Sequence, residues 1–198
     1  MEVDVIDTLA GIAPGSPLDL VRRTRRAVAR EHAQKSYDSL FAPADAGGFD
    51  PVERFAIAVF VAGLHAQTAI KDFYAARLGS AGATDAMCAA IDAEIAVAAT
   101  RGPYGAYPKG PLSKEDTSGL IHRVADAQRE ALGPRLSAAF EHVHMLVFHP
   151  RDAAPASLQA MLDAGWRTDA LVTLSQLVAF LSFQIRVVAG LRVLAARS

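Results

Sequence analysis

The sequence is poor in cysteine: Cys88 is the one thiol among 198 residues. A single cysteine excludes a disulfide within the chain and any site that needs two thiols from one subunit. The absence of disulfides favours a reducing compartment. Cys88 lies in the helical stretch 85–91 without a basic neighbour that would stabilise a thiolate. We therefore expect it to be an inert residue of the core.

The sequence also lacks a net charge that could attract a polyanion. It has 20 lysines and arginines and 21 aspartates and glutamates, for a formal charge of −1. Such a chain has no overall field that would draw it to nucleic acid or to an anionic membrane. Residues 1–4 are acidic where a signal peptide is basic, and no apolar stretch of the signal type follows. We expect a cytoplasmic protein that binds neither nucleic acid nor membrane.

Runs of β-branched residues are scarce, whereas alanine is abundant. Strands favour β-branched residues and helices favour alanine, so the composition indicates an all-α fold. Hydrophobic residues make up 52% of the chain and charged residues 21%. That balance excludes a disordered chain and provides enough apolar side chains for a core.

Proline and capping residues mark the starts of the expected helices. Residues 50–53 form a capping box, with Asp50 as the N-cap, Pro51 at the first helical position and Glu53 at the third. Glycines mark several of the expected ends. The pattern predicts helices over residues 17–40, 51–78, 84–100, 136–148, 155–164 and 168–196, and another that begins within 113–116.

Glycine and proline also divide the chain. Gly47 and Gly48 separate an N-terminal helical arm, residues 1–46, from a helical domain, residues 47–198. Within that domain, loop 101–112 contains three prolines and three glycines, which exclude regular structure. We expect this loop to serve as a tethered arm, a lid or a strap between subunits.

The stretch 171–185 is almost entirely apolar. It is shorter than the roughly 20 residues that span a bilayer, and it contains serine, threonine and glutamine. A helix that is apolar nearly all round is usually central in a bundle or buried between subunits. Residues 178–184 within it weakly repeat residues 61–67, which predicts two weakly related helical halves.

Two segments resemble the carboxymuconolactone decarboxylase/alkylhydroperoxidase-D-like superfamily. Residues 136–191 are similar to the second half of a peroxidase-related member: a helix, an Arg-Asp corner, a short helix ending in Ala-Gly, and a long apolar helix with a core at 180–186. Residues 48–91 resemble the family's central helix pair. The resemblance implies a helical bundle that assembles as a homotrimer or homohexamer.

The resemblance also indicates where the chemistry would lie. In family peroxidases a glutamate begins the helix, a Cys-x-x-Cys pair follows twelve residues later, and a histidine comes four residues after the pair. The matching positions in this sequence are Glu53, His65, Thr68 and Asp72. Both cysteines and the histidine are therefore replaced, which puts peroxidase activity of the family type in doubt.

Glu53, His65, Thr68 and Asp72 remain candidates for a catalytic site without thiols. On a continuous helix, residues 65, 68 and 72 would share one face, where a histidine beside a carboxylate can act as a general base. Each residue also has a structural interpretation. Glu53 closes a capping box, His65 could be a core histidine, and Asp72 could pair with Lys71 or Arg77.

A second group comprises Arg186 and three histidines. Arg186 lies in the most apolar helix, so it should either form a buried ion pair with an acid from a neighbouring helix or subunit or bind a substrate carboxylate. His144 is a candidate to bind the substrate, because one histidine among His142, His144 and His149 could reach His65. Metal binding is disfavoured, since residues two apart on a helix point to different faces. We expect no metal and no cofactor.

Three functions are consistent with these patterns. The first is an enzyme, or a degenerate enzyme, that acts on a small organic molecule through a non-thiol acid-base pocket. The second is a peroxidase-related oxidoreductase that borrows a thiol. The third is a structural subunit that pairs with a cysteine-containing homologue.

Overall fold

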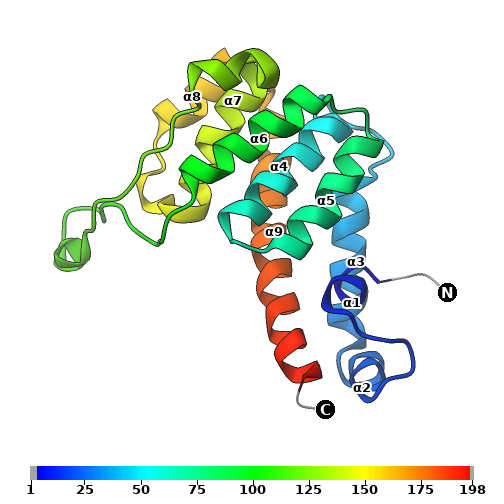
Figure 1. Ribbon diagram of the computed structural model, residues 1–198. Helices are drawn as coiled ribbons and strands as arrows, with labels where there is room; N and C mark the ends of the chain where they lie inside the picture. Colours follow the sequence, from blue (N-terminus) through cyan, green and yellow to red (C-terminus); the bar gives the residue numbers. More distant parts are fainter. Residues whose placement is uncertain (1–3, 197–198) are drawn as a thin grey trace.

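The computed structural model describes residues 4–196, and these form nine α-helices and no β-strand, as the composition predicts (Figure 1). The N-terminal arm consists of α1 (Val5–Ala10), α2 (Pro17–Arg25) and α3 (Ala27–Phe41). Helix α1 packs against the C-terminal half of the last helix, where Arg192 donates hydrogen bonds to the carbonyl of Leu9. The arm is therefore fastened to the end of the chain.

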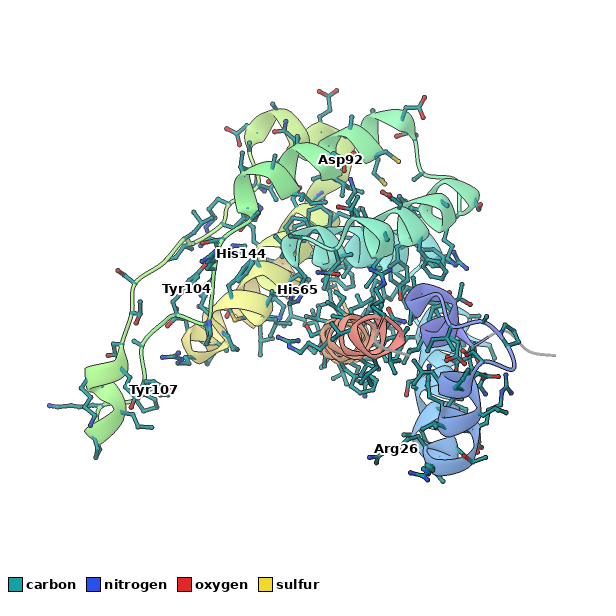
Figure 2. The ribbon with its side chains drawn as sticks, turned by 60° about the horizontal axis from the view of Figure 1, so that its bottom comes forward. Arg26, His65, Asp92, Tyr104, Tyr107 and His144 are labelled. Atoms are coloured by element: carbon teal, nitrogen blue, oxygen red, sulfur yellow. The ribbon has the colours of Figure 1, made fainter. Side chains whose placement is uncertain are left out.

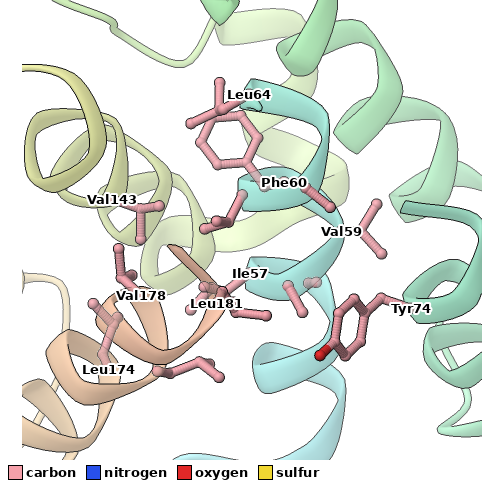
Figure 3. Close-up of a cluster of buried hydrophobic side chains, with 14 of the residues drawn as sticks. Ile57, Val59, Phe60, Leu64, Tyr74, Val143, Leu174, Val178 and Leu181 are labelled. Atoms are coloured by element: carbon pink, nitrogen blue, oxygen red, sulfur yellow. The ribbon is translucent and has the colours of Figure 1, made fainter. Parts of the chain in front are cut away.

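Helix α4 (Pro51–Leu64) is the centre of the bundle. It packs against α5 (Thr68–Ser80), α6 (Asp85–Ala98), α7 (Asp126–Phe148) and α9 (Thr168–Ala195). Figure 3 shows Ile57 and Phe60 on α4 facing side chains such as Leu181 and Val143. The predicted capping box begins this helix, with Asp50 and Glu53 each accepting the other's backbone N–H.

Two helices that the sequence predicts as continuous are broken. The helix expected over 17–40 divides into α2 and α3 at Arg26, which has non-helical angles. The helix expected over 51–78 ends at Leu64 because Ala66 turns into the left-handed region, with φ of 54°. Helix α5 then starts at Thr68 and runs back along α4. A hydrophobic pattern that continues through both helices concealed the second turn.

The predicted helix beginning within 113–116 is wrong. Pro111–Glu115 is a single 3-10 turn, η1, at the tip of an arm that projects from the body (Figure 1). Residues 116–125 are extended and return toward the bundle, because Thr117 pairs with Gly105 through their backbones. We call residues 99–125 the projecting arm. Helix α7 starts at Asp126, and Gly133, with φ of 72°, divides it into two helical segments, the second of which corresponds to the predicted helix 136–148.

Two further elements complete the bundle. The 3-10 turn η2 (Pro150–Asp152) forms a corner after α7, and α8 (Pro155–Asp163) agrees with the predicted short helix. Helix α9 is long and apolar enough to cross a membrane by length and composition, and 39% of its most apolar window is buried in the fold. It contacts α4, α1, α7 and α3. The relationship between the two halves stays a prediction.

Candidate functional site

The four predicted catalytic residues do not come together. Glu53 is buried at the start of α4, where its carboxylate accepts hydrogen bonds from Arg135 at 2.7 and 3.0 Å. His65 follows the other end of the same helix. Twelve residues of helix separate the two by about 18 Å. Glu53 therefore has the structural role that the capping box indicated, and Arg135 is its partner.

Residues 65, 68 and 72 do not share a helix face, because α4 ends before His65. Thr68 and Asp72 lie on α5 and are exposed, and Lys71 pairs with Asp92 instead of Asp72. His65 is partly buried, and its Nε2 is enclosed without a hydrogen-bond partner. Burial lowers the pKa of His65, and the charge of nearby Arg186 lowers it further. The junction thus holds a neutral histidine without a carboxylate beside it.

Arg186 and His144 also differ from expectation. Arg186 is exposed on α9 and donates to the carbonyl of Ser182, so it forms no buried ion pair within the described residues, and a pair with a neighbouring subunit stays a prediction. The outer side of α9 is open to solvent, which a sequence pattern that is apolar all round cannot reveal. His144 on α7 is fully buried, and its Nε2 lies 3.1 Å from the carbonyl oxygen of Ala98 at the end of α6.

The structure gathers a different set of polar groups around one pocket of about 250 Å³. One face of α7 forms its floor with Ala138, Glu141, His142 and Met145, which follow helical spacing. The return leg of the projecting arm, the η2 corner and α8 form the other walls. Figure 2 shows Tyr104 where the arm joins the body near His144, with Tyr107 far out toward the tip. From these walls come Ile121, His122, Arg123, His149, Asp152, Ser157 and Ala160.

His149 and Asp152 form a hydrogen-bonded pair in this pocket. The η2 corner places them three residues apart, and Nδ1 of His149 lies 3.1 Å from Oδ2 of Asp152. Oδ1 of the same carboxylate accepts the backbone N–H of Ala106 at 2.9 Å. Both carboxylate oxygens are thus occupied, which fixes the orientation of Asp152. A carboxylate at Nδ1 favours the tautomer with a bare Nε2.

Several buried imidazole nitrogens around the pocket lack partners. Nε2 of His149, Nε2 of His122 and Nδ1 of His142 are enclosed without hydrogen bonds. All three side chains are more than nine-tenths buried. Nε2 of His122 lies 3.0 Å from Oε2 of Glu94. An unpaired buried polar atom costs about 1–3 kcal/mol, so the other two, on His149 and His142, leave hydrogen bonds for a ligand or water to supply.

Burial sets the protonation of these groups. It lowers the pKa of His122 and His142, and it lowers the pKa of His144 to about 4, with the neighbouring His122 adding to that effect. These imidazoles are therefore neutral at pH 7 and present hydrogen-bonding nitrogens instead of positive charges. Burial acts in the opposite sense on Glu94, whose pKa it raises.

Glu141 fastens the return leg of the projecting arm to α7. Its carboxylate accepts bonds from Arg123 at 2.6 Å, from Arg129 at 2.7 Å and from the backbone N–H of Val124 at 3.2 Å. This anchoring delivers His122 to the pocket. Over residues 4–196, no three histidine, cysteine, aspartate or glutamate side chains are grouped as metal ligands.

Comparison with known proteins gives no relative. No family model, no curated protein and no solved structure matches this chain. The chemistry of the pocket must therefore be inferred from its own residues.

Sequence reasoning missed three residues of this region. His122 lies in a segment that the sequence assigned to a helix, and Glu94 lies in α6 without a motif. Asp152 carried the clearest signal, because it follows His149 by three residues across Pro150. A proline directly after a histidine favours a turn, and a turn can bring the histidine to a nearby carboxylate.

Proposed function

We propose that the chain binds a small organic molecule in the α7–α8 pocket and removes a proton from it with Nε2 of His149. One observation carries this proposal: Asp152 orients His149 through Nδ1, while Nε2 of this pocket-lining residue is enclosed without a hydrogen-bond partner. A general base needs a bare nitrogen held in a fixed direction, and a carboxylate partner stabilises the imidazolium that forms.

The rest of the pocket is suited to a small and largely apolar ligand. Ala138, Met145 and Ala160 provide apolar contacts, and the volume of about 250 Å³ limits the size of the ligand. His142 offers an unpaired Nδ1 for a hydrogen bond. These groups act without a thiol, a metal or a cofactor. The proposed function therefore keeps the acid-base chemistry that the sequence suggested, with His149 as the base in place of His65.

Membership of the carboxymuconolactone decarboxylase/alkylhydroperoxidase-D-like superfamily is part of the same proposal. The break between α4 and α5 supports it, because His65 and Thr68 flank a helix junction where the resemblance puts the thiol pair. A peroxidase would need a borrowed thiol. Cys88 is partly buried and packs against the hydrophobic core, so its environment favours the structural role that the sequence predicted.

The outer face of α9 favours a role in assembly as well. Val172, Phe183 and Val193 are about half exposed and follow one side of the helix together with Gln176, Ala179, Arg186 and Gly190. Exposed apolar residues along one helix face are typical of protein interfaces. We propose that this face packs against sister subunits in a homotrimer or homohexamer. A cysteine-containing homologue is the alternative partner.

Ring opening of 5-nitrobenzisoxazole tests the base directly. When a base removes the ring C–H proton, the N–O bond breaks and a coloured cyanonitrophenolate leaves, so no cofactor is needed. We expect saturable ring opening by the protein. His149→Asn should lower the rate by about a hundredfold, because the base is lost, and Asp152→Asn by about tenfold, because its orientation is lost.

His32→Asn is the matched control, since His32 is an exposed histidine outside the pocket. It should react like the unmodified protein. If His149→Asn folds normally and opens the ring as fast as the control, His149 is not the base and the proposed function is wrong.

A further inference from the structure

A second hollow continues the α7–α8 pocket along helix α8. The two hollows share three lining residues, His142, Met145 and Ser157. The second hollow has a volume of about 360 Å³, compared with about 250 Å³ for the pocket. We call it the α8 groove, and its other lining residues are Leu146, Ala153, Ala154, Pro155, Leu158 and Ser175.

Helical spacing explains why one side of α7 serves both hollows. Met145 and Leu146 follow His142 by three and four residues, so the three side chains lie on one face of the helix. Because His142 and Met145 line both hollows, they lie where the hollows meet, and Leu146 continues this face into the α8 groove. A molecule with its reacting end in the pocket can therefore extend along α7 into the groove.

The lining of the α8 groove is suited to hydrocarbon. Among the described residues, no charged side chain lines it. Its two hydroxyl groups are already bonded: Oγ of Ser157 accepts the N–H of Ala154 at 3.2 Å and donates to the carbonyl of Ala154 at 2.6 Å, and Oγ of Ser175 donates to the carbonyl of Leu171 at 2.9 Å. A polar or charged group bound there would lose its hydration without gaining partners from these hydroxyls.

A third hollow continues the pocket on the side of the projecting arm, and its chemistry differs. It shares Ile121 and Asp152 with the pocket, and Asp116, Thr117 and Ser118 are among its other lining residues. An alkyl chain placed there would take water away from two carboxylates. Of the two extensions of the pocket, the α8 groove is therefore the one that fits an apolar chain.

We propose that the molecule deprotonated by His149 has two parts, a small head that lies in the α7–α8 pocket and an alkyl tail that lies in the α8 groove. This inference rests on the proposed function and names its substrate class, an amphiphile with the acidic C–H in its head. The observation that carries it is the continuity of the pocket with an apolar groove through His142 and Met145.

Calorimetric titration with phenol, 4-propylphenol and 4-hexylphenol tests the inference. The phenol hydroxyl can donate a hydrogen bond to the bare Nε2 of His149, and the para position directs the alkyl chain away from that hydroxyl. We expect the affinity to rise by about two- to fourfold for each added methylene, because each methylene that enters the groove is removed from water.

Two leucines of α8 provide a matched pair of variants. Leu158 lines the groove and is 48% exposed, whereas Leu162, which is 39% exposed, does not line it. Leu158→Asp should lower the affinity ratio of 4-hexylphenol to phenol by about tenfold, because it places a carboxylate beside the tail. Leu162→Asp should leave that ratio unaltered. Ala154→Trp should lower the ratio by filling the groove, which tests the position of the tail without adding a charge.

His149→Asn separates the binding of the head from the binding of the tail. It should weaken phenol and 4-hexylphenol by the same factor, because the hydroxyl loses its acceptor while the alkyl chain keeps its contacts. The affinity ratio of the two compounds should therefore stay the same. If His149→Asn weakens neither compound, the head does not reach His149 and the inference is overturned.

The outcomes also distinguish this inference from the proposed function. An affinity that does not rise with chain length, or an equal loss of the ratio in Leu158→Asp and Leu162→Asp, overturns the inference. Ring opening of 5-nitrobenzisoxazole that depends on His149 would still support the proposed function in that case. If the ratio falls in Leu158→Asp alone but ring opening does not depend on His149, the binding of the tail is supported and the proposed function fails.

Discussion

The missing side chain of Gly105 makes room for the carboxylate of Asp152. A Cβ atom at Gly105 would lie 2.8 Å from both carboxylate oxygens, and the glycine has φ of 109°, which other residues rarely adopt. The base of the projecting arm thus holds Asp152 against His149.

This contact predicts that Gly105→Ala slows the reaction although Gly105 does not line the pocket. We expect ring opening of 5-nitrobenzisoxazole to fall by about tenfold, because Asp152 must move and His149 loses its orientation. Gly110→Ala at the tip of the arm is the control, since its Cβ would meet no contact closer than 3.7 Å. Equal rates for Gly105→Ala and Gly110→Ala would show that the projecting arm does not fix the orientation of Asp152 and His149.

Glu53 should matter for stability and not for chemistry. Glu53→Gln keeps a side chain that can close the capping box but loses the charged bonds to Arg135, which also lies over the ring of Trp166. We expect the free energy of unfolding in urea to fall by about 1–3 kcal/mol. A fully stable Glu53→Gln variant with slow ring opening would instead show that Glu53 takes part in catalysis.

Acid should destabilise the fold through its buried histidines. The pKa of His144 is about 4 in the folded chain and about 6.5 when unfolded, so below pH 6.5 the unfolded chain binds a proton that the folded chain does not. Stability is therefore lost as pH falls from about 6.5 toward 4, by on the order of 2 kcal/mol at pH 5 from His144 alone.

Urea unfolding at pH 7.5 and pH 5 measures this loss. The raised pKa of Glu94 makes this residue stabilise the fold as pH falls, which opposes the effect of His144. Comparing the unmodified protein with His144→Leu therefore isolates the contribution of His144. That variant should be less stable at pH 7.5, since the carbonyl of Ala98 loses its partner, but its stability should depend less on pH. If the stability of His144→Leu depends on pH as strongly as that of the unmodified protein, His144 is already protonated in the folded chain at pH 5.

The sequence predicted the parts of this fold that local chemistry determines. The capping box at Asp50 and Glu53 and the start of α8 at Pro155 were correct, because caps and prolines act on their own neighbours. The turn at Ala66 was missed, since alanine carries no turn signal and the apolar pattern continues past it. The pocket could not be predicted, because His122, His142 and Ser157 come together only through the tertiary packing of three separate segments.

The outer face of α9 predicts an oligomer. We expect sedimentation velocity to show a trimer or hexamer for the unmodified chain and a smaller species for Phe183→Asp, because a buried charge in the interface has no partner. Val97→Asp is the matched control, since Val97 is also an exposed apolar residue and lies on α6. A monomeric unmodified chain at micromolar concentration would contradict the proposed assembly.

The tautomer of His149 tests the central claim most directly. Nitrogen-15 NMR of histidine-labelled protein at pH 7.5 distinguishes the proton on Nδ1 from one on Nε2, and His149→Asn identifies the signal. We predict a proton on Nδ1, a bare Nε2 whose resonance shifts when cyanonitrophenol is added, and loss of this preference in Asp152→Asn. A His149 that carries its proton on Nε2 and ignores the ligand would contradict the account.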